Sequence, residues 1–499
     1  MFNKCESNKC HDNNPFCYAF RFGPTQRPKT FTMRVYICRM LFTQRTWMWA
    51  TMVALTLLWI SCKPYTEVLP PEEEYPPAEQ YGTPFQSVPA TDDIILYEVN
   101  LRAFSSTGDL QGVINKLDHL QSLHVNVIWL MPIHPIGTVN SVNSPYSVRD
   151  YKAVSSEYGD LTTLRALTDA AHARGMAVIM DWVANHTAWD NPWMSNTSWY
   201  TQDANGNVII PPGTNWADVA DLNFDNTDMR AAMIEAMRYW VLQANVDGFR
   251  CDYADGVPVD FWTEALASLR SIPNRQLVML AEGDRTDHYT AGFDMTFAWD
   301  YYTQLKNVFQ GQPAFTINAT SANEYTNVPT GKHKLRFTTN HDQSAWEATP
   351  PTLFGGIDGA TAATVAQVFM RGVPLIYTGQ EVGRLTTVPF FSNSPIDWTA
   401  NASMLSKYRE IYGIYSNLEV ARRGNLTLHG ANDAIVIEKE LNGEHLLVVV
   451  NVRNTAVSVP MPAALQNTAW STAITGTTEF IGSTMGLMPY EYKILGYME

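Results

Sequence analysis

The residues that could carry chemistry in this chain stand at the ends of short apolar segments. One such segment is "VDGFRCDYADG", residues 246–256, in which Arg250 precedes Asp252 by two positions and a second carboxylate follows at Asp255. Residues two apart on a strand lie on the same face, so the guanidinium of Arg250 can lie beside Asp252 and lower the pKa of its carboxyl group. Taken alone, the pattern is equally typical of a buried strand that ends in a salt bridge. The ends of the other apolar segments have to decide between these readings.

Three further apolar segments end in acids, amides and histidines. These residues are Asp181, Asn185 and His186 after "AVIM", Glu282 after "LVMLA", and Asn340, His341 and Asp342 in "RFTTNHD". Ionised carboxylates placed close together repel one another and lower the stability of the fold. Such a cluster is therefore typical of sites where the shifted pKa values serve catalysis. A pair of carboxylic groups cleaves a glycosidic bond when one attacks or shields the anomeric carbon and the other protonates the leaving oxygen. Asp252 suits the first role, and Glu282 suits the second if neighbouring carboxylates raise its pKa.

The elements that must position these residues follow from the hydrophobic pattern beyond Asp92. Near-continuous apolar runs alternate with amphipathic stretches, as buried parallel strands alternate with helices. The predicted strands are residues 94–100, 125–133, 177–183, 248–252, 277–283, 293–298, 336–342 and 375–381, with helices among others over 109–123, 160–175 and 227–244. Eight strand–helix units predict an α/β fold, a (β/α)₈ TIM barrel, in which the C-terminal strand ends open into one shared cleft.

Two departures from the repeat predict further domains. A segment rich in Trp, Asn and Pro, about residues 188–223, follows the third strand and is far longer than an ordinary loop, which predicts a small lid domain. Alternating segments near the C-terminus, with a hairpin signal at Asn442-Gly443, predict an antiparallel β-sandwich. We therefore expect the barrel over residues 92–402 and the sandwich over 403–499.

The same segments resemble the hallmark motifs of the α-amylase family of glycoside hydrolases. "DWVANH", "GFRCD", the Glu of "LAEG" and "TTNHD" match four main motifs in order, and "IWLMPI", "ADLN" and "GVPLIYTGQE" are similar to secondary ones. The resemblance implies a retaining enzyme in which Asp252 is the nucleophile, Glu282 the general acid/base and Asp342 a third carboxylate that stabilises the transition state. It also implies substrate-binding roles for Arg250, which would hold the nucleophile ionised, for Asp181, His186 and His341, which would bind sugar hydroxyls, and for Tyr146, on which that sugar would stack.

The resemblance implies endo-acting cleavage of α-1,4-glucosidic bonds in starch or maltooligosaccharides, with no cofactor needed for the chemistry. Where many family amylases carry a Lys-His pair that contacts the leaving sugar, this chain has Asp255 and Gly256. Pullulan or cyclodextrin cleavage and transglycosylation therefore stay open. The backbone of that histidine also helps to bind a structural calcium, so although Asn185 matches one calcium ligand, the complete calcium site does not carry over.

Two other functional classes compete with a glycosidase. A metal-dependent hydrolase would use His186 and His341, but the first strand lacks a His-x-His pair and each histidine follows an asparagine. Amino-acid transporter heavy chains use the same barrel behind a membrane anchor without catalysis, yet they lose the catalytic carboxylates, and all three stand in this chain. The formal net charge of -15, with 49 acidic and 34 basic residues, argues against nucleic acid as a partner.

The first residues predict export. Basic residues up to Arg45 and the apolar run "WMWATMVALTLLWI" predict a signal segment over residues 1–61, and "LLWISC" resembles the lipobox of bacterial lipoproteins, in which Cys62 is lipidated. Residues 62–91, rich in Pro and Glu, would form an extended mobile tether. We expect a lipoprotein held to a membrane through this anchor only, a location compatible with the outer membrane or cell surface of a Gram-negative bacterium. Five of the six cysteines lie at or before Cys62, which leaves Cys251 without a partner for an intramolecular disulfide.

Overall fold

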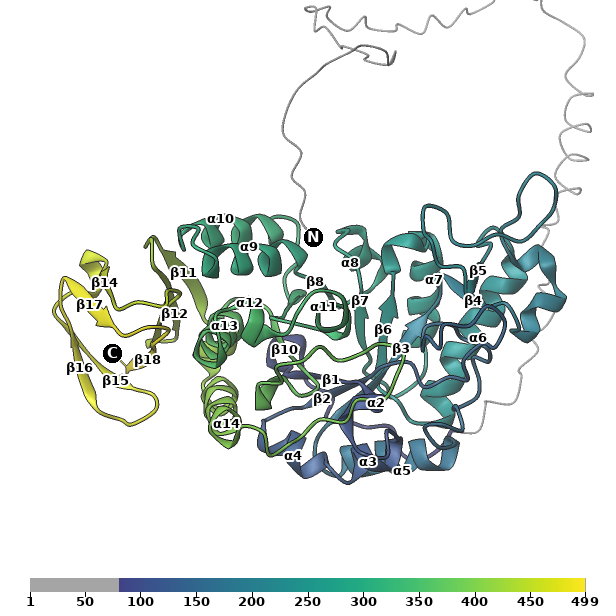
Figure 1. Ribbon diagram of the computed structural model, residues 1–499, viewed down its shortest axis with the longest axis horizontal. Coiled ribbons are helices and arrows are strands. Elements are labelled where there is room, and N and C mark those ends of the chain that lie inside the picture. The colour runs from purple at the N-terminus through teal and green to yellow at the C-terminus, as the bar shows by residue number, and fades with distance from the viewer. Residues whose placement is uncertain (1–79, 499) are drawn as a thin grey trace, which may run out of the picture. The chain divides into compact units, whose positions relative to one another are not determined.

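Eight parallel strands close into a barrel at the centre of the molecule (Figure 1). The computed structural model describes residues 80–498, so the predicted signal segment and Cys62 lie outside the described residues. The barrel strands are β1 (Leu96–Val99), β2 (Val127–Leu130), β3 (Ala177–Val183), β6 (Gly248–Asp252), β7 (Val278–Ala281), β8 (Met295–Phe297), β9 (His333–Arg336) and β10 (Val373–Tyr377). They are hydrogen-bonded in the order β1-β10-β9-β8-β7-β6-β3-β2, which confirms the predicted (β/α)₈ barrel.

Alternation along each strand builds two apolar layers. On β1, Leu96 joins a cluster inside the barrel with Trp129 and Leu375, whereas Tyr97 joins the larger core between strands and helices. The surrounding helices are α2 (Leu101–Phe104), α3 (Leu110–Ile114), α4 (Leu117–Ser122), α5 (Leu161–His172), α6 (Thr227–Gln243), α7 (Val259–Arg270), α8 (Asp287–Ala291), α9 (Trp299–Phe309), α10 (Thr316–Glu324), α11 (His341–Trp346), α12 (Pro350–Leu353), α13 (Ile357–Phe369), α14 (Ala402–Asn417) and α15 (Glu419–Arg423). Because apolar side chains fill the barrel interior, the polar residues of the strands lie at the strand ends.

The seventh barrel strand lies earlier in the chain than predicted. A strand was expected over 336–342, but β9 ends at Arg336 and α11 begins at His341. The reason is a helix cap, because the side chain of Asn340 accepts a hydrogen bond from the backbone N–H of Gln343 at 2.9 Å. The helix predicted over 109–123 is likewise divided into α3 and α4.

Part of the predicted tether is docked on the barrel. The hydroxyl of Tyr81 donates to Asp169 of α5 at 2.6 Å, and the ring of Phe85 stacks on His172 with centroids 4.3 Å apart. Aromatic rings gain free energy when they leave water, so these two side chains hold the segment in place. The expectation of a mobile chain over 62–91 is therefore wrong from residue 80 onward. Within the described residues, no helix has the length and apolar character needed to cross a membrane.

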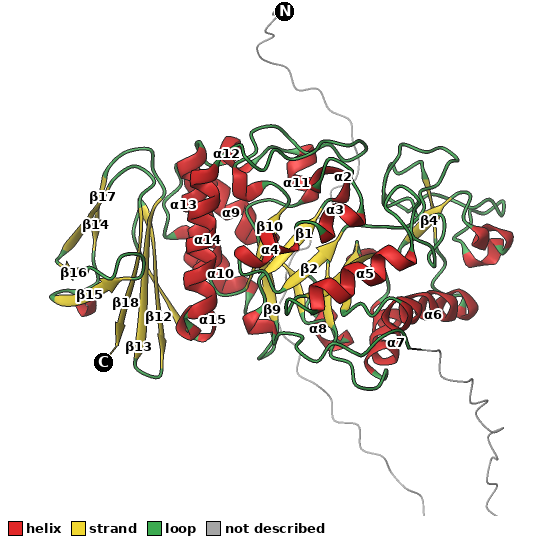
Figure 2. Cartoon of the chain, turned by 90° about the horizontal axis from the view of Figure 1, so that it is seen from below, coloured by secondary structure: helices red, strands yellow, loops and turns green. Residues whose placement is uncertain are grey.

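The C-terminal strands form a six-stranded antiparallel sheet and a two-stranded sheet. Their bounds are β11 (Asn425–His429), β12 (Ala434–Leu441), β13 (Glu444–Asn451), β14 (Val457–Pro460), β15 (Thr468–Thr472), β16 (Thr478–Ile481), β17 (Thr484–Leu487) and β18 (Tyr492–Met498). Figure 2 shows α13 and α14 between these strands and the barrel strands. On β12, Ile435 and Ile437 belong to the core that contains these helices, whereas Val436 belongs to the core between the two sheets.

Two helices precede the strands of the C-terminal domain. Residues 402–423 form α14 and α15, and the first strand of the domain, which was expected over 403–499, starts at Asn425. α14 buries Tyr408, Ile411 and Tyr415, and the hydroxyl of Tyr408 hydrogen-bonds to Thr364 of α13 at 2.8 Å. These contacts make α14 part of the helical layer around the barrel.

A short antiparallel pair of strands frames the predicted lid region. β4 (His186–Ala188) pairs with β5 (Val219–Asp221), and residues 189–218 lie between them as turns and two short 3₁₀ helices. The pairing holds both ends of this long segment beside the C-terminal end of β3. The segment can therefore supply one wall of the cleft.

Candidate active site

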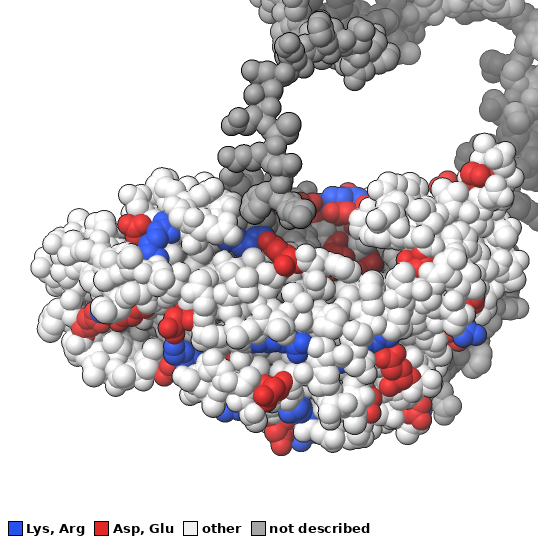
Figure 3. Space-filling model, in the orientation of Figure 1, with Lys and Arg blue, Asp and Glu red and all other residues white. Residues whose placement is uncertain are grey.

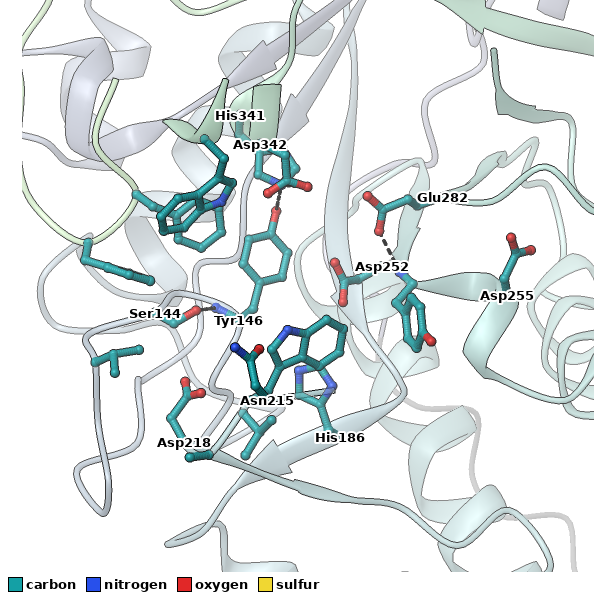
Figure 4. A pocket seen from close by; sticks show the side chains of 18 of the residues that line it. Ser144, Tyr146, His186, Asn215, Asp218, Asp252, Asp255, Glu282, His341 and Asp342 are labelled. Carbon is teal, nitrogen blue, oxygen red and sulfur yellow. Dashed lines mark hydrogen bonds and ion pairs between the residues drawn. The ribbon is translucent and has the colours of Figure 1, made fainter. Parts of the chain in front are cut away.

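A cavity of about 870 Å³ opens at the C-terminal ends of the barrel strands. Figure 3 shows acidic side chains in a hollow of the surface, and Figure 4 shows the cavity from close by. The lining includes Ser144, Tyr146, His186, Trp216, Asp218, Asp252, Tyr253, Asp255, Glu282, His341, Asp342, Trp346, Phe390 and Phe391. The three carboxylates predicted from the sequence are thus brought together.

Strand register places two of these carboxylates at the same level. Asp252 is the last residue of β6 and Glu282 directly follows β7. Cys251 and Ala281 are register partners, and the backbone N–H of Glu282 donates to the carbonyl of Cys251 at 2.9 Å. Neighbouring strands lie about 4.8 Å apart, so the two side chains enter the cavity side by side. Asp342 reaches the same space from the first turn of α11.

Arg250 is fully buried beneath these acids and is shared among three of them. Its Nη1 lies 2.7 Å from Asp181 Oδ1 and 2.9 Å from Asp252 Oδ1, and its Nη2 lies 2.7 Å from Glu282 Oε1. The ring of Trp129 lies 5.0 Å from the guanidinium carbon. One fixed cation therefore balances a cluster of carboxylates.

Burial and the positive charge of Arg250 act on the pKa of Asp252 in opposite directions. Burial raises the pKa of Asp252 well above its usual range, and the neighbouring carboxylates of Glu282, Asp181 and Asp342 raise it further. Arg250 lowers this pKa, as the sequence predicted, but does not outweigh the opposing effects. The net direction is upward because burial, which the local sequence does not reveal, has the largest effect.

Asp181 lies behind the cavity wall and does not line it. The residue is 1% exposed, and both of its carboxylate oxygens are occupied. Oδ1 pairs with Arg250, while Oδ2 accepts from the hydroxyl of Tyr146 at 3.0 Å and from the indole Nε1 of Trp129 at 3.1 Å. Asp181 was expected to bind a sugar hydroxyl, and the structure places it in contact with three protein side chains. Asp181 instead orients Arg250 and Tyr146, which surround the carboxylates.

The two cavity histidines have opposite titration behaviour. Burial lowers the pKa of His186 to about 4, so its imidazole is neutral at pH 7. Burial also lowers the pKa of His341, but the charges of Asp342 and Glu98 and a hydrogen bond to Glu98 outweigh it, against a smaller opposing effect of Arg250, and raise the value to about 9. His341 is therefore an imidazolium at pH 7, and His186 is not.

The hydrogen bonds around His341 agree with a charged ring. Nδ1 lies 2.5 Å from Glu98 Oε1, and Nε2 lies 2.9 Å from the hydroxyl oxygen of Tyr146. The single hydroxyl proton of Tyr146 goes to Asp181, so His341 Nε2 must donate to Tyr146. With Glu98 ionised, both ring nitrogens of His341 are donors.

Sequence reasoning missed Glu98, which joins this network from β1. Its side chain is fully buried, and one hydrogen-bonded chain leads from it through His341, Tyr146 and Asp181 to Arg250. The signal was present, because an acid within the apolar run "IILYEVN" is seldom buried without a partner. The partner could not be identified, since it lies 243 residues away in the sequence.

The loop after Asp252 is tied to the loop that carries Glu282. Tyr253 has a left-handed backbone with φ of 42°, and its N–H donates to Glu282 Oε2 at 2.7 Å. Asp255 lies 2.6 Å from His288 Nε2. A Cβ at Gly283 would lie only 2.3 Å from Asp255 Oδ1, so this close approach requires glycine. Asp255 thus places an anion, in contact with the loop that carries Glu282, where many family amylases have a Lys.

Asn185, which matches one calcium ligand in the family resemblance, is buried next to the cavity residue His186. Its Nδ2 lies 3.3 Å from His186 Nδ1. Across residues 80–498, no group of three or more His, Cys, Asp or Glu side chains is arranged to hold a metal ion. The described residues thus contain no donor cluster of the kind that a metal-dependent hydrolase would use.

Comparison with known proteins places this site in a family. The family profile "Alpha amylase, catalytic domain" matches residues 82–211 and 212–410, about two thirds of the chain and nearly the whole barrel. The chain belongs to the α-amylase family. As a family member it is a glycoside hydrolase, and the carboxylates described above stand at the strand ends where this barrel places its active site.

Relatives of this α-amylase family member include α-amylases from bacteria and archaea. It is 29% identical to α-amylase 3 of Dictyoglomus thermophilum over 360 residues, which cover 63% of this chain and 69% of that one. It is 26% identical to α-amylase MalA of Haloarcula japonica over 407 residues, which cover 77% of this chain and 59% of that one. The match thus spans only part of the length of each relative. The crystal structure of an α-amylase from Lactobacillus plantarum superimposes with a TM-score of 0.74 at 27% identity, covering 82% of this chain and 99% of that one.

Proposed function

We propose that the protein is a retaining, endo-acting hydrolase of uncharged α-glucans that cleaves α-1,4-glucosidic bonds in starch or maltooligosaccharides. The observation that carries the proposal is the pair Asp252 and Glu282, which enter one cavity from adjacent strands in register and contact the same guanidinium. This proximity favours direct attack, because retaining glycosidases hold their two carboxyl groups about 5 to 5.5 Å apart, too close for a water between them. Names of relatives support the substrate class, since two of them are α-amylases.

The chemistry assigns each carboxylate a step. The carboxylate of Asp252 attacks the anomeric carbon while protonated Glu282 gives its proton to the departing glycosidic oxygen, which leaves a covalent glycosyl ester on Asp252. Glu282, now ionised, removes a proton from water, and that water displaces Asp252 from the anomeric carbon. Asp342 places its negative charge near the positive charge that develops on the sugar ring. Two inversions at the same carbon give overall retention.

The charges of the residues that line the cavity favour an uncharged substrate. Five acids line it, Asp218, Asp252, Asp255, Glu282 and Asp342, whereas no Lys or Arg is among the described lining residues. A negative cavity repels phosphorylated or carboxylated sugars. Tyr146 and Trp216 offer apolar ring surface to the C–H faces of a neutral sugar, and His186 and His341 offer polar atoms to its hydroxyl groups.

The residues near the departing sugar are also compatible with other activities of the family. Asp255 stands where many family amylases have a Lys, and Trp216 and Tyr253 contact each other edge to face at 5.3 Å beside it. Such a leaving site could also serve a neopullulanase, a cyclomaltodextrinase or a transglycosylating member of the family. A non-catalytic role like that of transporter heavy chains is disfavoured, because all three carboxylates reach the cavity.

A product profile tests the proposed substrate. We expect the protein to cleave starch and maltooligosaccharides faster than pullulan or cyclodextrins and to release oligosaccharides of several lengths from the start of the reaction. Chromatography of early products measures both features. Faster cleavage of pullulan or cyclodextrin would contradict the proposal and favour the alternatives, and glucose as the sole early product would contradict endo action.

Glu98→Gln should move the alkaline limit of activity towards neutral pH. The folded-state pKa of His341, about 9, lies above the usual value of 6.5, so its imidazole stays charged at neutral pH and loses this charge as pH rises through about 9. Removing the charge of Glu98 lowers the pKa of His341, and we expect the alkaline limb of kcat/KM to fall by about one pH unit. A pH profile of both proteins measures the shift. An unchanged alkaline limb would show that the His341 charge does not limit activity.

A further inference from the structure

Trp346 is a large aromatic side chain left open to solvent on the cavity wall. It is 65% exposed, whereas Trp216, another tryptophan of the lining, is 36% exposed. Apolar groups that gather on an exposed surface often mark a binding site. Neither the sequence motifs nor the carboxylate mechanism accounts for this residue.

The helix that carries Asp342 also aims Trp346 at the cavity. Asn340 caps α11, and Asp342 and Trp346 follow four residues apart, which places them on one face of the helix. The next residue, Glu347, pairs with Lys306 at 2.5 Å and accepts from the hydroxyl of Tyr302 at 2.7 Å, both on α9. The indole thus projects from a helix whose two ends are fixed.

Two phenylalanines connect Trp346 to the proposed sugar site. The ring of Trp346 lies 5.7 Å from that of Phe390 and 5.8 Å from that of Phe391. Phe390 in turn stacks on Tyr146 with centroids 5.5 Å apart and lies 5.7 Å from His341. The aromatic surface is therefore continuous from Tyr146 outward to Trp346.

The aromatic surface lies on the side away from the proton donor. Glu282 must protonate the sugar that leaves, so the leaving side is the side of Glu282, where Tyr253 and Asp255 lie. Figure 4 shows Glu282 and Asp255 on one side of Asp252, and Tyr146 and His341 on the other. Trp346 therefore borders the retained part of the substrate.

We propose that Trp346, supported by Phe390 and Phe391, is a stacking platform for an α-1,4-linked glucose residue on the retained side, beyond the sugar that contacts Tyr146. The inference rests on the proposed function and adds a determinant of chain length to it. The ring of glucose presents C–H groups on its faces, and these pack on an indole without any charged partner. Substrates with a single glucose on the retained side do not reach the platform.

Trp346→Ala should weaken cleavage of longer substrates selectively. We expect kcat/KM for release of p-nitrophenol from p-nitrophenyl α-maltotrioside to fall about three- to tenfold, the loss expected for one stacking contact, and that for p-nitrophenyl α-glucoside to change less than about twofold. Both substrates have the same leaving group on the Glu282 side. Trp346→Phe should recover part of the loss. Equal losses on both substrates, or no loss on the maltotrioside, would overturn the proposal.

A matched control and a binding measurement separate this inference from the proposed function. Leu385→Ala removes another apolar side chain, 68% exposed and outside the cavity lining, and should leave both rates unchanged. Calorimetric titration with maltotriose, in the Asp252→Asn background, should show about three- to tenfold weaker binding when Trp346 is also Ala. If the Trp346 variant binds maltotriose more weakly but the wild-type protein cleaves no substrate, the platform is supported and the proposed hydrolysis is refuted. Equal affinities would refute the platform.

Discussion

Asp252→Asn should abolish turnover of maltooligosaccharides, with a loss in kcat of at least about 10⁴-fold. The amide fills the same volume beside Arg250, so the fold should persist, but it cannot form the glycosyl ester. Initial rates on maltotetraose, with circular dichroism to verify folding, measure the effect. Asp260→Asn is the matched control, because Asp260 lies on the surface of α7 in an ion pair with Arg230 and should affect rates less than about twofold.

The same assignment fixes the stereochemistry of the product. Attack by Asp252 followed by attack of water inverts the anomeric carbon twice, so the first-formed reducing end should be the α-anomer. Proton NMR during the first minutes distinguishes the anomers before they equilibrate. A β-anomer as the first product, or near-normal cleavage by Asp252→Asn, would show that the site is misassigned.

Glu282→Gln should have the second-largest effect, and its size should depend on the leaving group. For maltooligosaccharides we expect kcat/KM to fall by about 10²- to 10⁴-fold, because the sugar alkoxide needs a proton to leave. For a 2-chloro-4-nitrophenyl maltotrioside the loss should be much smaller, since that phenolate leaves without protonation and kcat/KM reports formation of the intermediate. Comparing kcat/KM for both substrates in wild type and variant measures this difference.

A suitable control for this variant is Glu264→Gln. Glu264 is an exposed residue of α7 paired with Arg230, and it is not among the residues that line the cavity. It should leave the kcat/KM values of both substrates within about twofold of wild type. Equal losses on both substrates for Glu282→Gln would contradict its role as the acid, because a purely structural defect does not distinguish leaving groups.

The sequence by itself determined the barrel and which residues meet at its mouth. Continuous apolar runs predict buried parallel strands, and in a barrel the C-terminal ends of those strands converge. Asp252 and Glu282 were predictable as a pair for this reason, since each stands at the end of such a run. The continuous six-residue match of "DWVANH" also located His186, which lines the cavity.

Only the tertiary structure decided how these residues are charged and which of them a ligand can touch. Asp181 proved to be buried behind Arg250 and Tyr146, and burial rather than Arg250 sets the direction of the Asp252 pKa. Glu98 and His341 form their pair across 243 residues of sequence. Local periodicity specifies the element and the face of each side chain, whereas desolvation and Coulomb interactions depend on neighbours that only the closed barrel brings together.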